Sequence, residues 1–317
     1  MKLFILLILF CMILFSCITE PDNDIQEFNP KLSLIASVEL PGNSWGVYVS
    51  DSYAYVASKE EGLYVIDISD PINPEIVGFV DTPENAINVY VFGSYAYVAD
   101  TYSGLVVIDI SNPYNPQIVG SVDTHYAYEV YVSGSYAYVT DRSEGLKVVD
   151  ISNQAEPIII GSVETDDAFG VQIDNSYAYI GDGFSGLKII DVGNPANPQI
   201  VGTVDTHYAE DISISNSYAY VCDLQGGLKI IDVSNPNYPV LIDSVYAEYA
   251  HGVFVSGSYA YVADGLAGLR MINISDPTNA FIVDLLETEG QEQNVHVEDP
   301  YVYLVTSTGL HIIKNRI

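Results

Sequence analysis

Seven copies of the motif Tyr-x-Tyr recur along the chain at nearly constant spacing. The intervals between successive copies are 42, 41, 41, 41, 41 and 42 residues. A period near forty residues, made of short β-type runs, is typical of a β-propeller, in which each repeat forms one blade. Seven copies therefore predict seven blades. The first tyrosines of the seven motifs are Tyr53, Tyr95, Tyr136, Tyr177, Tyr218, Tyr259 and Tyr301.

One repeat contains enough β-type sequence for a complete blade. The second repeat has four runs, Asn88–Phe92, Tyr95–Asp100, Leu105–Ser111 and Gln117–Asp123, each bounded by turn residues. The short connections predict an antiparallel meander of four strands. The turn between the first two strands always centres on a residue that tolerates positive φ. These residues are Asp51, Gly93, Gly134, Asn175, Asn216, Gly257 and Asp299.

The two ends of the repeat array predict how the ring closes. The last repeat stops after its third strand, Leu310–Lys314, and so lacks an outer strand. The segment Leu32–Leu40 matches the fourth-strand pattern of Ile118–Asp123. We therefore expect this N-terminal strand to complete the last blade and remove an open sheet edge. The predicted fold is an all-β, seven-bladed β-propeller of four-stranded antiparallel blades, spanning residues 31–317.

The repeated tyrosines are interpreted as core residues between blades. Alternate side chains of a strand point to opposite faces, so each tyrosine pair lies opposite the small residues of the same strand. Packing a large-residue face against a small-residue face fills the space between blades. A sugar-stacking platform is the less favoured alternative. Cys222 occupies the position of Ala57 and Ala99 in other repeats, which predicts a small buried residue and not a nucleophile. Asp67 and its equivalents in the third strands are expected to fix the following turn.

The N-terminal residues predict export and a lipid anchor. Lys2 precedes an apolar stretch, Leu3–Phe15, which is too short for a comfortable membrane span. The sequence Ser16-Cys17 at its end resembles a bacterial lipobox, in which the cysteine is acylated. We interpret residues 1–16 as a lipoprotein signal peptide and 17–30 as a lipidated tether, which places the protein outside the cytoplasm, in the cell envelope. An ordinary secretory signal and an anchor helix are the alternatives.

The charge of the chain restricts its partners. Its 42 acidic and 10 basic residues give a formal net charge of −32. Such a surface repels nucleic-acid phosphates and attracts cations or basic partners. We therefore expect no nucleic-acid partner, and we expect a monomer. Cleavage before Cys17 would remove Cys11 and acylation would occupy Cys17, so only Cys222 would keep a free thiol and no intramolecular disulfide would be possible.

Sequence divergence between the repeats marks the face where a ligand would bind. Loops from a fourth strand to the next first strand lie on the same face as the turns between strands two and three, and here the repeats differ most. Aromatic rings beside carboxylates and imidazoles suit a sugar or a peptide. The candidate ligand-binding residues, expected around the mouth of the central channel, are Trp45, His125, Tyr126, Glu129, Asp167, His207, Tyr208, Glu210, Asp211, Tyr249 and His251.

Sharper chemical interpretations receive less support from the sequence. The histidines lack close ligand spacing for a transition metal. The acids that end the second strands, Asp100, Asp141, Asp182, Asp223 and Asp264, are possible calcium ligands, but hydrogen bonding to the following glycine-containing turn is favoured. We expect no other cofactor. Glu210 and Asp211 are adjacent, which is a poor arrangement for glycosidase chemistry. The chain has no HExxH or P-loop motif, and no GxSxG or GxGxxG motif in a strand–helix context.

The third-strand phrases Leu105–Asp109, Leu146–Asp150 and Leu228–Asp232 resemble the LVIVD-repeat family of predicted propeller repeats in secreted and surface proteins of bacteria and archaea. The resemblance covers residues 31–317. It implies a surface location and a binding role, without common catalytic residues. The leading hypothesis is therefore a lipid-anchored propeller for binding, adhesion or scaffolding, which recognises a protein or a glycan through its variable face. The alternative is a hydrolase or lyase that acts on a polysaccharide in the central channel.

Overall fold

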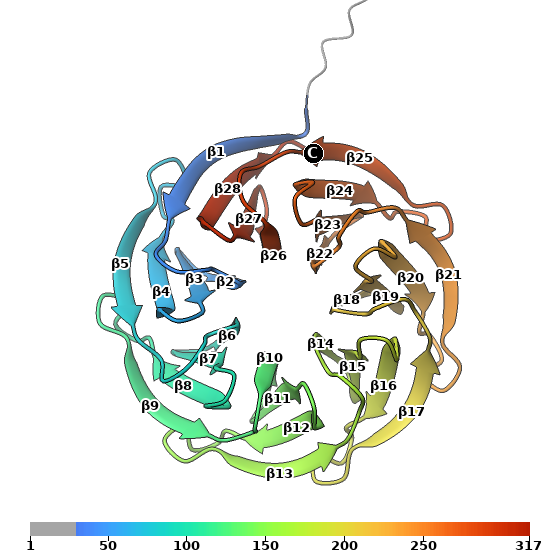
Figure 1. Cartoon of the computed structure of the whole chain (residues 1–317), viewed down its shortest axis with the longest axis horizontal. Helices are drawn as coiled ribbons and strands as arrows, with labels where there is room; N and C mark the ends of the chain where they lie inside the picture. The colour runs from blue at the N-terminus through green and yellow to red at the C-terminus, as the bar shows by residue number, and fades with distance from the viewer. Residues whose placement is uncertain (1–29) are drawn as a thin grey trace, which may run out of the picture. The chain divides into compact units, whose positions relative to one another are not determined.

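The seven predicted repeats fold as seven four-stranded antiparallel sheets around a common centre (Figure 1). A computed structural model describes residues 30–317, so the predicted signal peptide, Cys17 and almost all of the tether lie outside the described residues. Six blades run from an inner strand outwards in chain order, and in the seventh the first strand of the chain, β1, takes the outer place. This arrangement confirms the predicted propeller. No helix within residues 30–317 is long and apolar enough to cross a membrane.

Equivalent strands of the blades occupy equivalent places in the ring. The inner strands are β2 (Gly46–Ser50), β6 (Asn88–Phe92), β10 (Ala127–Ser133), β14 (Val171–Asp174), β18 (Asp211–Ser215), β22 (Gly252–Ser256) and β26 (Glu292–Glu298). The second strands are β3 (Tyr53–Ser58), β7 (Tyr95–Ala99), β11 (Tyr136–Asp141), β15 (Tyr177–Gly181), β19 (Tyr218–Cys222), β23 (Tyr259–Ala263) and β27 (Tyr301–Thr306). The third strands are β4 (Gly62–Asp67), β8 (Leu105–Asp109), β12 (Gly145–Asp150), β16 (Leu187–Asp191), β20 (Leu228–Asp232), β24 (Leu269–Asn273) and β28 (Gly309–Asn315). The outer strands are β5 (Glu75–Val80), β9 (Gln117–Val122), β13 (Ile158–Val163), β17 (Gln199–Val204), β21 (Val240–Val245), β25 (Phe281–Leu286) and β1 (Leu32–Glu39).

The core consists of layers between neighbouring blades, as the tyrosine pattern predicted. The second tyrosine of every pair is buried, and the first is partly buried. Tyr55 of the first blade packs in one apolar cluster with Val89, Ala96 and Ile108 of the second. Cys222 is also fully buried, and burial raises the pKa of its thiol well above the ordinary range. The predicted burial of the tyrosines between blades and of Cys222 is therefore confirmed.

The N-terminal strand closes the ring. β1 pairs antiparallel with β28, from Leu32 opposite Asn315 to Glu39 opposite Gly309. The side chain of Leu32 is 1 % exposed and lies in the apolar cluster of Met271. Its backbone N–H donates a hydrogen bond of 2.9 Å to Oδ2 of Asp284 in the sixth blade. β1 therefore fastens the seventh blade and also contacts its neighbour.

The turns follow the predicted chemistry with one exception. Asp67 Oδ1 accepts a hydrogen bond of 2.9 Å from the backbone N–H of Ser69, and equivalent bonds recur in the following blades. Six of the seven first-turn residues have positive φ, as predicted. Asp299 does not, so the prediction was wrong there: Pro300 follows it, in a cis peptide bond, and proline restricts the backbone of the preceding residue.

Replacing Leu32 by alanine is expected to destabilise the closed ring. A buried leucine truncated to alanine costs about 2–5 kcal/mol of folding free energy. Leu34 lies on the same strand but is 45 % exposed, so Leu34→Ala should change stability by no more than about 0.5 kcal/mol. Urea unfolding of both variants measures the difference. Equal losses would mean that the buried contacts of β1 do not close the ring.

Candidate functional site

The loops that lead into each blade lie beside the turns between second and third strands. We call the former incoming loops, and the face that they share with the turns the upper face. Isolated antiparallel bridges join a turn to the incoming loop of the next blade, as between Lys59 and Ala86 and between Leu224 and Ala250. The sequence-divergent segments therefore share one face, as the sequence predicted.

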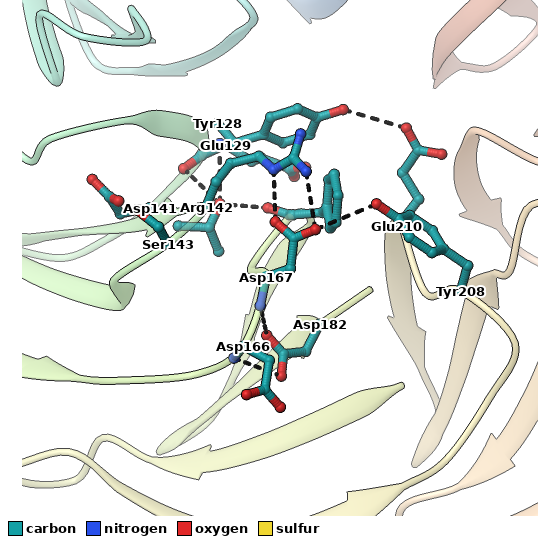
Figure 2. Close-up of polar contacts among 12 residues, drawn as sticks. Tyr128, Glu129, Asp141, Arg142, Ser143, Asp166, Asp167, Asp182, Tyr208 and Glu210 are labelled. Atoms are coloured by element: carbon teal, nitrogen blue, oxygen red, sulfur yellow. Dashed lines mark hydrogen bonds and ion pairs between the residues drawn. The ribbon is translucent and has the colours of Figure 1, made fainter. Parts of the chain in front are cut away.

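Buried aspartates at the ends of the second strands hold the incoming loops in place. Asp182 accepts hydrogen bonds of 3.2 and 2.9 Å from the backbone N–H groups of Asp166 and Asp167 (Figure 2). Asp223 accepts the N–H groups of His207 and Tyr208 at 2.9 and 2.6 Å. These carboxylates are fully buried, and backbone donors compensate for part of the cost of burying their charge.

The sequence predicted the wrong hydrogen-bond partner for the side chains of these aspartates. Hydrogen bonding to the following glycine-containing turn was expected, but only the backbone of Asp182 makes that contact, through its N–H to the carbonyl of Gly186 at 2.8 Å. The side chain instead accepts from the loop that precedes its own blade. The loop is distant in sequence but lies next to the strand end, because the blade folds back on itself.

A pocket of about 470 Å³ opens on the upper face. A continuous series of aromatic rings lines it, with centroid distances of 6.2 Å from Trp45 to Tyr128, 5.0 Å from Tyr128 to Phe169 and 5.3 Å from Phe169 to Tyr208. Burial raises the pKa values of both tyrosines, so their hydroxyls stay protonated at neutral pH. The pocket thus offers apolar rings together with hydroxyl groups.

Two basic residues contribute to this upper pocket. The guanidinium of Arg142 forms a bidentate pair with Asp167, with nitrogen–oxygen distances of 2.8 and 2.9 Å (Figure 2). The same guanidinium lies 4.1 Å from the ring centroid of Phe169. Lys59 Nζ lies 3.9 Å from the ring centroid of Trp45. Sequence reasoning missed both, although they are two of only 10 basic residues in the chain and lie in turns on the divergent face.

An imidazole–carboxylate pair forms another wall of the upper pocket. His251 Nδ1 lies 3.0 Å from Glu210 Oε2, and the Tyr128 hydroxyl donates to Glu210 Oε1 at 3.3 Å (Figure 2 shows the second contact). Burial lowers the pKa of His251, but the hydrogen bond and charge of Glu210 outweigh burial and leave that pKa raised. Among residues 30–317, neither His251 Nε2 nor Trp45 Nε1 has a hydrogen-bond partner, and both atoms are buried.

Below the upper pocket the inner strands approach closely and form a constriction. Its free volume is about 30 Å³, the room of roughly one water molecule. A Cβ on Gly46 would lie 2.7 Å from Asn88 Cα, and one on Gly170 would lie 2.8 Å from the Glu210 carbonyl oxygen. Only glycine fits such an approach. The constriction therefore separates the upper pocket from the rest of the channel.

Two carboxylates line the constriction together, the buried Asp211 and the half-buried Glu129. Asp211 accepts the backbone N–H groups of Ile212 and Val253, each at 2.7 Å. Burial nevertheless raises the pKa of Asp211 to about 7. Burial and the charge of Asp211 raise the pKa of Glu129 well above its ordinary range. Each ionised carboxylate makes ionisation of the other less favourable.

The structure brings together eight of the eleven predicted site residues. Those in the upper pocket, the constriction or direct contact with them are Trp45, Tyr126, Glu129, Asp167, Tyr208, Glu210, Asp211 and His251. The other three, His125, His207 and Tyr249, are exposed and lie outside the pocket linings. Within the part of the chain that the structure describes, no group of three or more His, Cys, Asp or Glu side chains is placed to hold a metal ion.

Comparison with known proteins relates the chain to a repeat family and to solved propellers. A family model described as LVIVD repeat matches residues 41–82, 83–124, 126–165, 167–206, 207–246 and 247–287. No curated protein matches the sequence.

Several solved structures share the fold at low sequence identity. The WD40 β-propeller domain of Doa1 superposes with a TM-score of 0.74 at 8% identity, over 91% of this chain and 98% of that one. The β-propeller domain of Cps50 (Swd1) from Myceliophteria thermophila gives 0.73 at 12%, over 89% and 99%. BamB from Moraxella catarrhalis gives 0.64 at 12%, over 90% and 97%. Such low identities establish the fold alone.

Glu129→Gln is expected to stabilise the protein more at pH 8 than at pH 4.5. An unfolded glutamate ionises near its ordinary pKa of 4.5, whereas folded Glu129 keeps its proton to higher pH. The folded state then binds more protons than the unfolded state, so the wild-type free energy of unfolding falls as the pH rises above about 4.5. Glutamine carries no such loss.

Thermal unfolding at several pH values measures this difference. Glu164 is exposed in the same blade, so Glu164→Gln serves as the matched control and should follow wild type at every pH. Parallel curves for Glu129→Gln and wild type would contradict a raised pKa of Glu129 in the folded protein.

Proposed function

The chain belongs to the LVIVD repeat family, and we propose that it is a binding or scaffold protein that recognises a glycan through the upper pocket of the propeller. The main support for this proposal is the combination of aromatic rings with oriented polar groups in that pocket. Sugars present apolar C–H faces and hydroxyl groups, which aromatic rings and planar hydrogen-bonding side chains match.

The polar groups of the upper pocket are held in position before any ligand binds. Arg142 is fixed by two hydrogen bonds to Asp167 and by its contact with Phe169. Asp167 itself is fixed through its backbone N–H to Asp182. Such preorganisation lowers the entropic cost of binding. The buried nitrogens Trp45 Nε1 and His251 Nε2, which lack partners among the described residues, favour a ligand that supplies hydroxyl groups.

The size and position of the upper pocket favour the end of a glycan chain. A volume of about 470 Å³ lies within the usual range of about 300–1,000 Å³ for ligand pockets. Exposed apolar side chains continue the surface beyond the pocket. Tyr102 lies edge-on to Tyr126 at 4.8 Å, and Phe184 lies edge-on to Tyr208 at 4.7 Å. These rings provide room for further sugar units.

A polysaccharide hydrolase or lyase is the alternative function. Its support is the raised pKa of Glu129 and Asp211, because a general acid must stay protonated at neutral pH. Neither acid lines the aromatic upper pocket; both lie at the constriction of about 30 Å³, which is far too small for a sugar ring, and face the cavity on its other side. Two acids line the upper pocket, Glu60 and Glu210, and Glu210 is paired with His251. The geometry therefore favours binding over hydrolysis.

The proposed location is the cell envelope, outside the cytoplasm, with a lipid anchor on Cys17. Its support is the sequence alone: an apolar segment too short for a span, Ser16-Cys17 at its end, and a polar stretch before the propeller. A protein held in this way carries its binding face away from the cytoplasm.

Tyr208→Ala is expected to weaken glycan binding about tenfold or more, because each factor of ten corresponds to about 1.4 kcal/mol and a buried aromatic contact can supply it. A glycan array with full-length protein identifies the ligand, and calorimetry then gives the affinities. Tyr238→Ala is the matched control, since Tyr238 is 77 % exposed in the turn between β20 and β21. Binding retained in folded Tyr208→Ala would move the site, and capture of a protein without any glycan would replace the proposed ligand class.

Cys17→Ser is expected to move the protein from the membrane fraction to the soluble fraction, or to leave the signal peptide uncleaved, because no thioether to the lipid can form. Fractionation followed by mass spectrometry of the mature N-terminus measures this. A mature wild-type chain that begins elsewhere than at Cys17, without an acyl group, would disprove the anchor.

A further inference from the structure

A second cavity, of about 370 Å³, lies on the other side of the constriction. We call it the lower cavity. Its walls come from the inner strands, which lie closest to the centre in Figure 1. Each inner strand places one residue at the height of this cavity, two positions along the strand from its residue at the height of the constriction. These residues are Tyr48, Tyr90, Tyr131, Gln172, Ser213, Phe254 and His296, and all except Ser213 line the cavity directly. The proposed glycan site does not use them.

Five of these side chains form an unbroken arc of aromatic rings. The ring centroids lie 4.7 Å apart for Phe254 and His296 and 4.8 Å apart for His296 and Tyr48. The distance is 4.7 Å both from Tyr48 to Tyr90 and from Tyr90 to Tyr131. Burial raises the pKa values of Tyr48 and Tyr90, so both stay neutral. The arc therefore presents aromatic rings and phenolic oxygens to whatever occupies the cavity.

His296 is an unusual member of this arc. It is 8 % exposed, and no hydrogen bond joins its imidazole ring to another residue of the described chain. Burial lowers its pKa to about 4, so the ring is neutral at neutral pH. A buried imidazole without a protein partner is costly unless a ligand or water satisfies it. His296 thus contributes an aromatic ring and an unused polar group, but no positive charge.

The charged groups of the lower cavity are all acidic. Glu129 and Asp211 lie at its inner end, beside the constriction, and the exposed Glu298 lies at the end of β26, away from it. None of the residues that line this cavity is a lysine or an arginine. The upper pocket differs, since Lys59 and Arg142 belong to its lining. Ionisation of an acid in this cavity without a cation nearby is unfavourable, and a positively charged ligand would relieve that cost.

We propose that the lower cavity is a second binding site, separate from the glycan site, for a small alkylammonium cation of the quaternary ammonium type. Aromatic rings attract such cations, with about 2 kcal/mol or more when the cation is desolvated. Asp211 at the inner end supplies the balancing charge when it is ionised, and a bound cation favours that ionised form. An inorganic ion fits less well, because calcium takes 6–8 oxygen ligands and the described residues place no metal-binding group of three.

Calorimetry with tetramethylammonium and choline as probes tests this site on the full-length protein. Saturable binding of both is expected, and 3,3-dimethyl-1-butanol, a neutral analogue of choline, should not bind measurably. Tyr90→Leu should weaken choline binding at least about tenfold, the scale of one lost cation–aromatic contact. Tyr90→Phe, which keeps the ring, should stay within about threefold of wild type. Asp211→Asn should also weaken binding.

The upper pocket provides the control that separates this site from the glycan site. Tyr208→Ala should leave choline binding unchanged, whether or not that variant affects a glycan. Loss of choline binding in Tyr208→Ala but not in Tyr90→Leu would place the cation in the upper pocket and overturn the proposal. Equal affinity for the neutral analogue, binding of calcium or potassium in place of choline, or the absence of saturable choline binding would each overturn it as well.

Discussion

The structure depends on the packing of tyrosine faces against small-residue faces between blades. Each buried tyrosine, such as Tyr97 or Tyr261, fills the layer to the next blade, and seven equal layers return the last blade to the first. Dense packing at every layer fixes the inclination of the blades. The inner strands consequently meet at one level, where glycine is required at positions such as Gly46. The constriction, and with it the division of the channel, follows from this packing.

The buried aspartates connect the uniform strands of the blades to the incoming loops, whose sequences differ. Asp141, Asp182 and Asp223 occupy the same place in successive blades and hold equivalent backbone positions of the incoming loops. The side chains at those positions differ from blade to blade. The same backbone geometry therefore presents different chemical groups around the upper pocket. A propeller of this kind can change its ligand by substitution in the loops without altering the backbone that supports them.

The sequence predicted the fold almost completely because the period, the turn residues and the closing strand are all local patterns. It also placed Trp45, Glu210 and His251 at the mouth of the central channel, because their distance in sequence from the repeated tyrosines defines their position along the channel. It missed Arg142, whose role depends on meeting Asp167 from another blade. It missed the lower cavity because only a closed ring brings Tyr48 next to His296. The partners of the aspartates were mistaken for the same reason, since a nearer turn was preferred to a loop that tertiary structure brings close.

The pairing of β1 with β28 also determines the order in which the fold can be completed during synthesis. Six blades are continuous in sequence, so each can form as soon as its own residues are available. The seventh needs Leu32 and Asn315, near opposite ends of the chain, to meet. Until the C-terminal residues have left the ribosome, β1 has no partner and the ring stays open.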